Sequence, residues 1–317
     1  MVVDYLSSQP NRAGYQVSTK QGSGPQERVM RIRRSQTVAL TVVVIIAAFV
    51  GAVAVWFAVP YSPLRSEFSR DVERAQAAAY TDSADVFVEE DFAAFPAAIQ
   101  NYIQRNGYIG TPKYSWVHLE FEDVDFRQGK DGRKLKVDYD QYNFAAEPRR
   151  LALVESAVAG VPFQGYDYFA DGKGGMKGVI GKAVTLFDER GPEMDKAALV
   201  TYLAESLFIP QSLLRNDIEF TELSEREVEA TFTYEGITVS GVFTFNEAYE
   251  MVEFRTHDRA VAGEDGTMTQ VDWTARCADY LPDAHGIRLP RTFQAVWNYP
   301  EQDLVYFDGS ISRATFG

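Results

Sequence analysis

The chain has 317 residues, 46% of them hydrophobic, and carries a formal net charge of −14 at pH 7. This composition is sufficient for one large folded domain or two smaller ones, and it excludes a wholly disordered protein. A strongly acidic chain lacks the basic surface that nucleic-acid binding requires, so we expect no nucleic-acid partner.

The first predicted element is an apolar run at residues 38–59, VALTVVVIIAAFVGAVAVWFAV, which contains no charged side chain. A helix of this length rises about 33 Å, enough to cross a bilayer core of roughly 30 Å. Trp56 and Tyr61 lie at one end, where aromatic rings favour the membrane interface. A cleaved signal peptide is the alternative, but a long segment precedes the run and no small-x-small cleavage site follows it. We therefore predict a transmembrane helix over residues 37–59 that contacts the lipid bilayer through residues 38–59.

The charge distribution predicts the orientation of this helix. Residues 1–36 carry six basic and two acidic residues, a net charge of +4, whereas the remainder carries 25 basic and 43 acidic residues, a net charge of −18. The positive-inside rule then predicts a single-pass plasma-membrane protein with a cytoplasmic N-terminus and residues 60–317 outside the cytoplasm. Residues 1–36 are rich in Gly, Ser, Gln and Pro, and are predicted to form a disordered cytoplasmic tail.

Two helices are predicted after the membrane segment. Residues 65–80 are rich in alanine and place an apolar residue on one stripe from Phe68 onward. We interpret residues 65–90 as a stalk or first helix. In residues 92–103 the apolar side chains again follow helical spacing, and Gly107 supplies the C-cap.

Beyond residue 115 the apolar period changes to two, which is typical of strands with one solvated face. Strands are predicted at 116–126 and 134–144, and many further strands follow toward the end of the chain. One helix at 196–208 interrupts them; it is apolar on nearly all sides and is therefore expected to be buried. The predicted fold class is α+β: one extracytoplasmic domain over 60–317, with its core from about residue 91, in which a large curved, half-barrel-like antiparallel sheet carries a few helices.

The glycine-rich stretch DGKGGMKG at residues 171–178 raises the question of a phosphate site. A Walker loop needs Ser or Thr after its lysine, but Lys173 and Lys177 are both followed by glycine. Both nucleotide motifs also need a helix to begin at the loop. The following residues fit helical spacing, but their glycines and β-branched side chains favour a strand. We predict a hairpin tip whose glycines supply positive φ, and no cofactor.

Metal and thiol chemistry are not expected. The single cysteine, Cys277, excludes an intramolecular disulfide and a cysteine-rich zinc site. The histidines at 118, 257 and 285 are far apart, and no HExxH or HxH spacing occurs.

One carboxylate suggests catalysis. Glu205 lies inside the apolar helix, where an ionised group needs a partner. It either forms a buried ion pair, with an arginine such as Arg255 or Arg259, or serves as a general acid or base. The candidate catalytic residues of the second interpretation are Glu205, Asp167 and His257.

Aromatic residues recur on the predicted strands. Most should form the core, but a curved sheet lined with aromatic side chains can also enclose an apolar cavity. The candidate ligand-binding residues are Tyr142, Tyr168, Tyr202, Glu205, Arg259, Trp273 and Trp297.

Four stretches carry a resemblance to a known family: FPAAIQNYIQRNG, QYNFAAEPRRLALVESAVAGVPFQGYDYFADGKGGMKG, ALVTYLAESLFIPQSLL, and EFRTHDRAV with VDWTARCADYLPDAHGIRLPRTFQAVWNYPE. Together they cover about residues 95–310 and are similar to a bacterial family of domains of unknown function. This resemblance implies no assigned reaction. The predicted architecture also resembles the half-barrels of periplasmic lipoprotein carriers, which hold acyl chains.

The leading functional hypothesis is non-catalytic binding of an apolar or lipid-like ligand, or of an envelope partner, by the extracytoplasmic domain. One alternative is a hydrolase-type or other enzyme that uses Glu205, Asp167 or His257. Another is a structural subunit of an envelope complex. The identity of any protein partner does not follow from the sequence.

Overall fold

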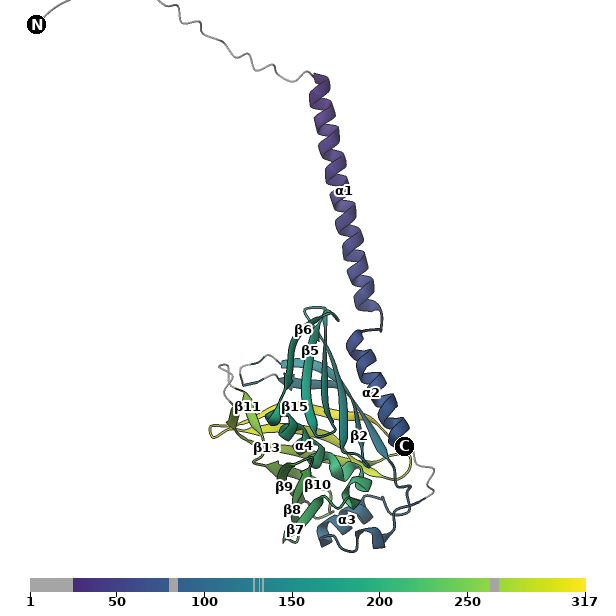
Figure 1. Cartoon of the computed structure of the whole chain (residues 1–317), viewed down its shortest axis with the longest axis vertical. Helices are drawn as coiled ribbons and strands as arrows, with labels where there is room; N and C mark the ends of the chain where they lie inside the picture. Colours follow the sequence, from purple (N-terminus) through teal and green to yellow (C-terminus); the bar gives the residue numbers. More distant parts are fainter. Residues whose placement is uncertain (1–24, 80–84, 128, 131, 133, 263–267) are drawn as a thin grey trace, which may run out of the picture. The chain divides into compact units, whose positions relative to one another are not determined.

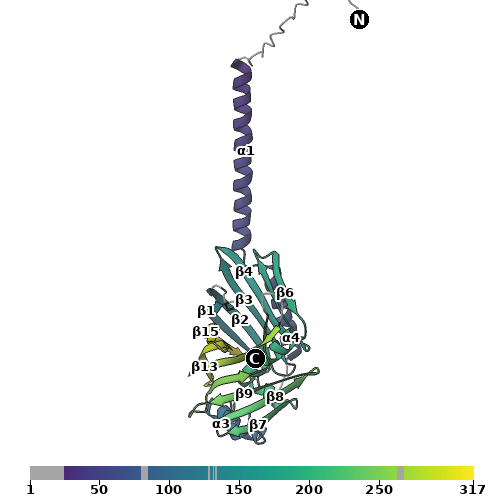
Figure 2. The ribbon, with the colours of Figure 1, turned by 90° about the vertical axis from the view of Figure 1, so that its left-hand side faces the viewer.

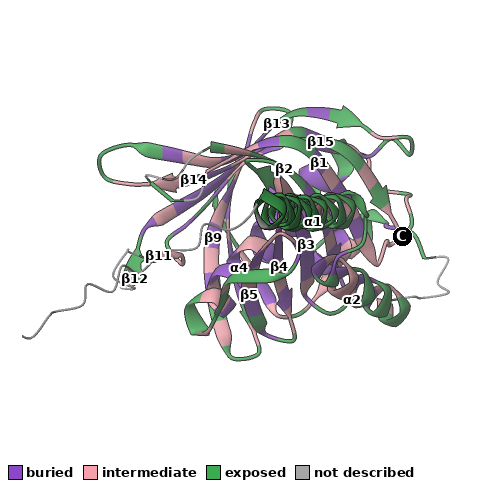
Figure 3. Ribbon diagram, turned by 90° about the horizontal axis from the view of Figure 1, so that it is seen from above, coloured by how far each residue is buried: buried purple, intermediate pink, exposed green. Residues whose placement is uncertain are grey.

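The computed structural model describes residues 25–79, 85–127, 129–130, 132, 134–262 and 268–317. The chain divides into two compact units, residues 1–58 and 59–317. The first unit contains α1 (Pro25–Ala58), whose described side chains are mostly exposed (Figure 3). Within the described part of the chain, one N-terminal helix is long and apolar enough to cross a membrane.

The predicted disordered tail at residues 1–36 differs from the structure in its last part. Residues 1–24 lie outside the described residues, but residues 25–36 already belong to α1. Pro25 occupies the first helical position, where its fixed φ is favourable, and no glycine or proline follows before the apolar run. The helix of the apolar run therefore continues back to Pro25 without a break.

The second unit is built on a 13-stranded sheet, and within the described residues each strand is antiparallel to its neighbours. The strand order is β6-β5-β4-β3-β2-β1-β15-β14-β13-β10-β9-β8-β7, so β6 and β7 are free edges and the sheet is curved but not closed (Figure 1 and Figure 2). The strands are β1 (Trp116–Arg127), β2 (Lys134–Phe144), β3 (Arg149–Val158), β4 (Val161–Ala170), β5 (Lys173–Ile180), β6 (Val184–Arg190), β7 (Ile218–Ser224), β8 (Glu227–Tyr234), β9 (Ile237–Phe245), β10 (Met251–Thr256), β13 (Asp272–Pro282), β14 (Arg288–Asn298) and β15 (Asp303–Phe316). A separate small hairpin joins β11 (Ala260–Ala262) to β12 (Met268–Gln270). The predicted α+β class with a large antiparallel sheet is confirmed.

Helices cover the inner face of this curved sheet. The predicted buried helix is α4 (Pro192–Glu205), which continues into two short 3-10 turns, η2 (Ser206–Phe208) and η3 (Pro210–Leu214). Leu199, Leu203 and Leu207 are fully buried and share one core with inward side chains of many strands. The turn η1 (Glu89–Phe92) and the helix α3 (Ala97–Arg105) belong to the same core, and Gly107 has the positive φ expected of a C-cap.

Alternation along the strands decides which side chains enter this core. In β1, Val117 and Leu119 are buried inside, whereas His118 and Glu120 point to the outer face. The period of two read from the sequence therefore marks the inner face correctly.

The helix α2 (Pro63–Ala79) packs on the outer face of the sheet. Its buried residues Leu64, Phe68 and Val72 form a second apolar cluster with outward side chains of β3 and β4, such as Leu151 and Tyr166. The sequence pattern of residues 65–90 predicts a stalk or a first helix; the structure has a helix over Pro63–Ala79, and its apolar stripe is covered by the sheet. Residues 80–84 lie outside the described residues.

The glycine-rich stretch at 171–178 is a strand rather than a loop over most of its length. Positive φ occurs only at the turn residues Asp171 and Gly172, and β5 begins at Lys173. Gly174 is required for another reason: a Cβ there would lie 2.4 Å from the Met194 carbonyl oxygen of α4. The predicted hairpin is confirmed, but its later glycines allow close packing of α4 and of side chains.

Candidate functional site

A buried polar network lies where α4 ends against β2, β3 and β4. Alternation in β3 turns Arg150 inward while Leu151 points to α2. The Arg150 side chain donates four hydrogen bonds, and the residue is only 5% exposed. Its acceptors are Glu205 Oε2 at 3.0 Å, Asp167 Oδ2 at 2.7 Å, Tyr139 Oη at 3.0 Å and Gln141 Oε1 at 2.9 Å.

Glu205, the last residue of α4, is 4% exposed. Besides Arg150, its Oε2 accepts hydrogen bonds from Gln141 Nε2 at 2.7 Å and Asn143 Nδ2 at 2.8 Å. Burial of a carboxylate without such donors would be costly. These three donors, one of which is the Arg150 cation, make the buried charge tolerable.

The predicted buried ion pair exists, but its expected partner is wrong. Glu205 pairs with Arg150 and not with Arg255 or Arg259. Arg255 is exposed on β10 and pairs with Glu253 at 3.0 Å, while Arg259 lies against two tryptophan rings. Alternation explains the difference, because Arg255 points away from the core that surrounds the end of α4.

The charges in the network stabilise one another. Burial by itself lowers the pKa of Arg150, but Glu205, Tyr139 and Asp167 outweigh it, and the pKa lies well above its usual value. Burial also raises the pKa of the Tyr139 hydroxyl above its usual range, so this group stays neutral and donates to Asp167 Oδ2 at 3.1 Å. The network therefore holds a permanent cation between two carboxyl groups.

The three candidate catalytic residues do not form one site. Arg150 brings Asp167 and Glu205 together. His257 is well exposed after β10, and its Nδ1 lies 2.6 Å from Asp272 Oδ1. A general acid or base must reach the proton of a substrate, whereas Glu205 is buried among its own donors. This geometry is typical of a structural network.

Three candidate ligand residues meet on the inner face of the sheet. The Arg259 guanidinium carbon lies 4.6 Å from the Trp273 ring centroid and 5.2 Å from that of Trp297. Arg259 Nη1 also donates to Thr201 Oγ1 of α4 at 3.3 Å. The two tryptophans are paired across β13 and β14 and therefore face the same side.

Two further aromatic residues extend this group, which we call the aromatic cluster (Phe126, Trp273, Trp297 and Tyr306). Trp273 Nε1 donates to Tyr306 Oη at 3.0 Å, and the Tyr306 ring stacks on Trp297 with centroids 5.8 Å apart. Trp273 is buried, but Phe126, Trp297 and Tyr306 are only half-buried against the core. Phe126 and Tyr306 are not among the candidate ligand residues predicted from the sequence; their alternating positions on strands were the available signal.

The remaining candidate ligand residues lie elsewhere. Tyr202 is buried in α4 and donates to the Phe144 carbonyl oxygen at 2.7 Å, so it is a core residue. Tyr142 is on the outer face and stacks on His118 with centroids 4.0 Å apart. Tyr168 is also on the outer face, beside a hollow of about 450 Å³ that α2 borders. That hollow is lined by Arg74, Arg149 and Arg190, and each of these arginines is paired with an aspartate.

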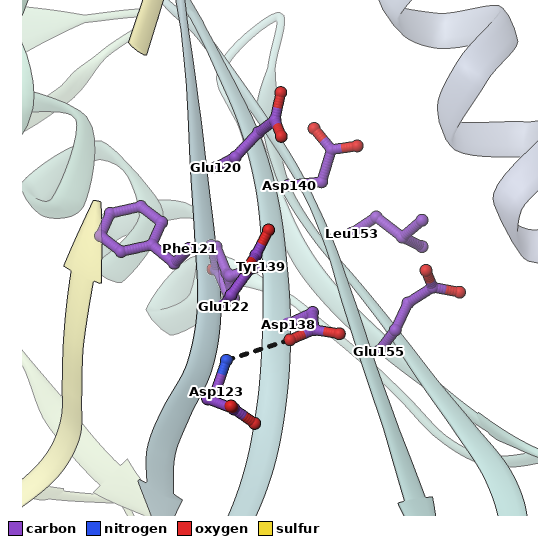
Figure 4. Close-up of a pocket in the computed structure, with 9 residues that line it drawn as sticks. All are labelled: Glu120, Phe121, Glu122, Asp123, Asp138, Tyr139, Asp140, Leu153 and Glu155. Carbon is purple, nitrogen blue, oxygen red and sulfur yellow. Dashed lines mark hydrogen bonds between the residues drawn. The ribbon is translucent and has the colours of Figure 1, made fainter. Parts of the chain in front are cut away.

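The outer face of β1, β2 and β3 carries an acidic hollow of about 430 Å³. In Figure 4, Glu120, Asp140 and Glu155 point to one side of these strands while Phe121 points to the other. The Asp123 backbone N–H donates to Asp138 Oδ1 at 3.1 Å. Among the residues that the structure describes, no group of three His, Cys, Asp or Glu side chains is arranged to hold a metal ion. Several of the lining carboxylates are paired, Glu120 with Arg313, Asp140 with His118 and Glu155 with Arg65. The signal of the hollow in the sequence was the acidic residues at alternate strand positions.

Comparison with known proteins gives a family but no activity. Residues 85–309 match the sequence profile of DUF6544, a family of unknown function. No curated protein matches the chain. A solved structure of a putative outer membrane lipoprotein-sorting protein domain from Vibrio parahaemolyticus is similar, with 10% identity, coverage of 69% of this chain and 90% of that chain, and a TM-score of 0.39. A DUF1329 family protein from Desulfovibrio piger also has 10% identity, covers 69% of this chain and 92% of its own, and has a TM-score of 0.37.

Proposed function

The chain belongs to DUF6544, a family of unknown function, and we propose from its own residues that it is a membrane-anchored, non-catalytic domain that binds an apolar or lipid-like ligand. In this proposal residues 1–36 are the cytoplasmic tail, residues 37–59 cross the plasma membrane, and residues 60–317 form the extracytoplasmic binding domain. The excess of positive charge before the apolar run supports this orientation.

The aromatic cluster is the observation that carries the proposal. Phe126, Trp297 and Tyr306 are large apolar side chains on the inner face that the core leaves half-covered. An acyl chain that covered them would gain about 25 cal/mol for each Å² of apolar surface removed from water. Arg259 lies against Trp297 and Trp273 of this cluster, so its cation can meet an anionic head group at the end of that chain.

The arrangement of the carboxylates favours binding over catalysis. Glu205 accepts three hydrogen bonds within the protein, and Asp167 accepts two. The donors of these bonds, Arg150, Tyr139, Gln141 and Asn143, are themselves buried. His257 lies apart from them and is paired with Asp272.

Native mass spectrometry of the full chain, extracted from membranes in mild detergent, tests the proposal. We expect the wild-type protein to carry a lipid-like mass adduct and Trp297→Ala to lose most of it. Trp116→Ala is the matched control, because Trp116 is a half-buried tryptophan in the cluster on the outer face. An adduct-free wild-type protein, or equal loss in both variants, would contradict the proposal. A stoichiometric protein partner in place of lipid would favour the structural-subunit alternative.

A further inference from the structure

Two neighbouring hairpin turns have an unusual composition for this acidic domain. The β3–β4 turn region, SAVAGVPF at residues 156–163, contains no charged residue. The β5–β6 turn region, VIGKAVTLF at residues 179–187, contains one, Lys182. Both regions lack carboxylates, although the chain as a whole has 45 acidic residues.

The apolar side chains of these turns are exposed. Val158 is 41% exposed, Val184 59% and Leu186 57%. Three alanines beside them are exposed as well, and we call the whole set the tip patch: Ala157, Val158, Ala159, Ala183, Val184 and Leu186. Turns on the surface of a soluble domain are ordinarily polar, so an apolar patch of this kind indicates a contact.

The two turns form one continuous surface. The Gly181 N–H of the β5–β6 turn donates to the Pro162 carbonyl oxygen of β4 at 2.7 Å. Phe163 and Ile180 are paired directly across β4 and β5. Strands β3 to β6 are consecutive in the sheet, so the β3–β4 and β5–β6 turns lie side by side at the same end of these strands.

A hydrogen bond places this surface beside Val59, the residue at which the apolar run ends. Lys182, at the β5–β6 turn, donates a hydrogen bond from Nζ to the carbonyl oxygen of Val59. Val59 is the last residue of the apolar run and the first residue of the second unit. Tyr61, two residues further along, is exposed, and tyrosine favours the interface between lipid and water. The tip patch therefore lies next to the residue at which the chain leaves the apolar run.

We propose that the tip patch is a second membrane contact and inserts into the lipid interface beside the transmembrane segment. The occupant is the bilayer itself, because the exposed apolar turns lie beside Val59, the last residue of the apolar run that the proposed anchor places in the membrane. The absence of carboxylates from both turns allows close approach to anionic lipids, which would repel the rest of this acidic domain. This inference rests on the proposed membrane anchor and is independent of the lipid-like ligand.

The test uses the full chain in nanodiscs of phosphatidylethanolamine and phosphatidylglycerol, with an environment-sensitive fluorophore on Val184→Cys. The native Cys277 stays unlabelled because it is buried, and burial raises its thiol pKa well above the usual value. The control is Leu223→Cys, which is 52% exposed on β7 at the opposite edge of the sheet. We expect the label at 184 to emit at shorter wavelength, and to be quenched several-fold more by lipid-borne nitroxide, than the label at 223.

Equal emission and quenching at positions 184 and 223 would overturn the tip-patch contact. Retention of the same protein in membranes after a carbonate wash would show that the anchor itself is intact in that case. Release by carbonate would overturn the anchor, and with it the inference. Strong quenching at position 184, together with an adduct-free wild-type mass spectrum, would support the tip-patch contact and remove only the proposed ligand.

Discussion

Replacing Arg150 by methionine removes the cation from the buried network while keeping most of the side-chain length. The change eliminates four hydrogen bonds and both ion pairs of Arg150. Glu205 then remains at 4% exposure with two amide donors and no cation. Asp167 is more exposed and can be solvated by water, so the damage centres on Glu205.

The expected cost follows from this geometry. Removing one partner of a buried ion pair destabilises a protein by about 3–5 kcal/mol, because the other charge is left without compensation. Domains have a total free energy of unfolding of about 5–15 kcal/mol, so this variant should lose a large part of it. Arg150→Met combined with Glu205→Met leaves no charge unpaired at the end of α4, and should be at least about 1 kcal/mol more stable than Arg150→Met alone.

Urea unfolding of the full chain in detergent, followed by tryptophan fluorescence and circular dichroism, measures these differences. Arg149→Met is the matched control, since the neighbouring arginine pairs with an exposed aspartate, Asp171. Its loss should cost less than about 1 kcal/mol. Equal destabilisation by Arg150→Met and Arg149→Met would refute the reasoning. A double variant that is less stable than Arg150→Met would show that packing, rather than charge balance, dominates.

Three further predictions concern packing and pH. Gly174→Ala should lower the free energy of unfolding by about 1–3 kcal/mol, since the added Cβ would press on the backbone of α4. Gly178→Ala is the control and should cost less, because its Cβ would meet only the ring of half-buried Phe187. A lower urea midpoint for Gly178→Ala than for Gly174→Ala would contradict this. Leu203→Ala should cost about 2–5 kcal/mol, because Leu203 is fully buried, and a thermal midpoint like that of the wild type would contradict it. Burial raises the pKa of Asp91, but the Lys113 ammonium and the Val88 N–H outweigh it and hold the pKa below its usual value. Asp91 therefore stabilises the fold above about pH 4, and this contribution is lost as the pH falls through the lower folded pKa. Asp91→Asn should cost about 1 kcal/mol at pH 7 and make less difference at pH 3; a constant difference between the two proteins across this range would contradict the assignment.

The location of the polar network was not predictable from the sequence, although one of its members was. Glu205 attracts attention because a charge inside an apolar helix requires a partner. Its partner Arg150 is 55 positions away in the chain, and any of several arginines satisfied the sequence pattern. Only the strand order, which brings β2, β3 and β4 against the end of α4, selects Arg150. The clustering of Arg259 with Trp273 and Trp297 is a further case, because each lies on a different strand or turn.

The sequence by itself determined the apolar helix near the N-terminus, the antiparallel strands and the buried helix α4. These depend on periodicity and on breaks between neighbouring residues, which are local properties. The resemblance to a family of unknown function was also readable, because it rests on the order of short motifs, and the profile match to residues 85–309 confirms it. The tertiary structure decided what local patterns cannot contain: that α2 packs on the sheet, that the glycines of β5 admit α4, and that the tips of two hairpins end beside Val59. Each of these is a contact between segments distant in the chain, and the folded sheet alone sets the distance between them.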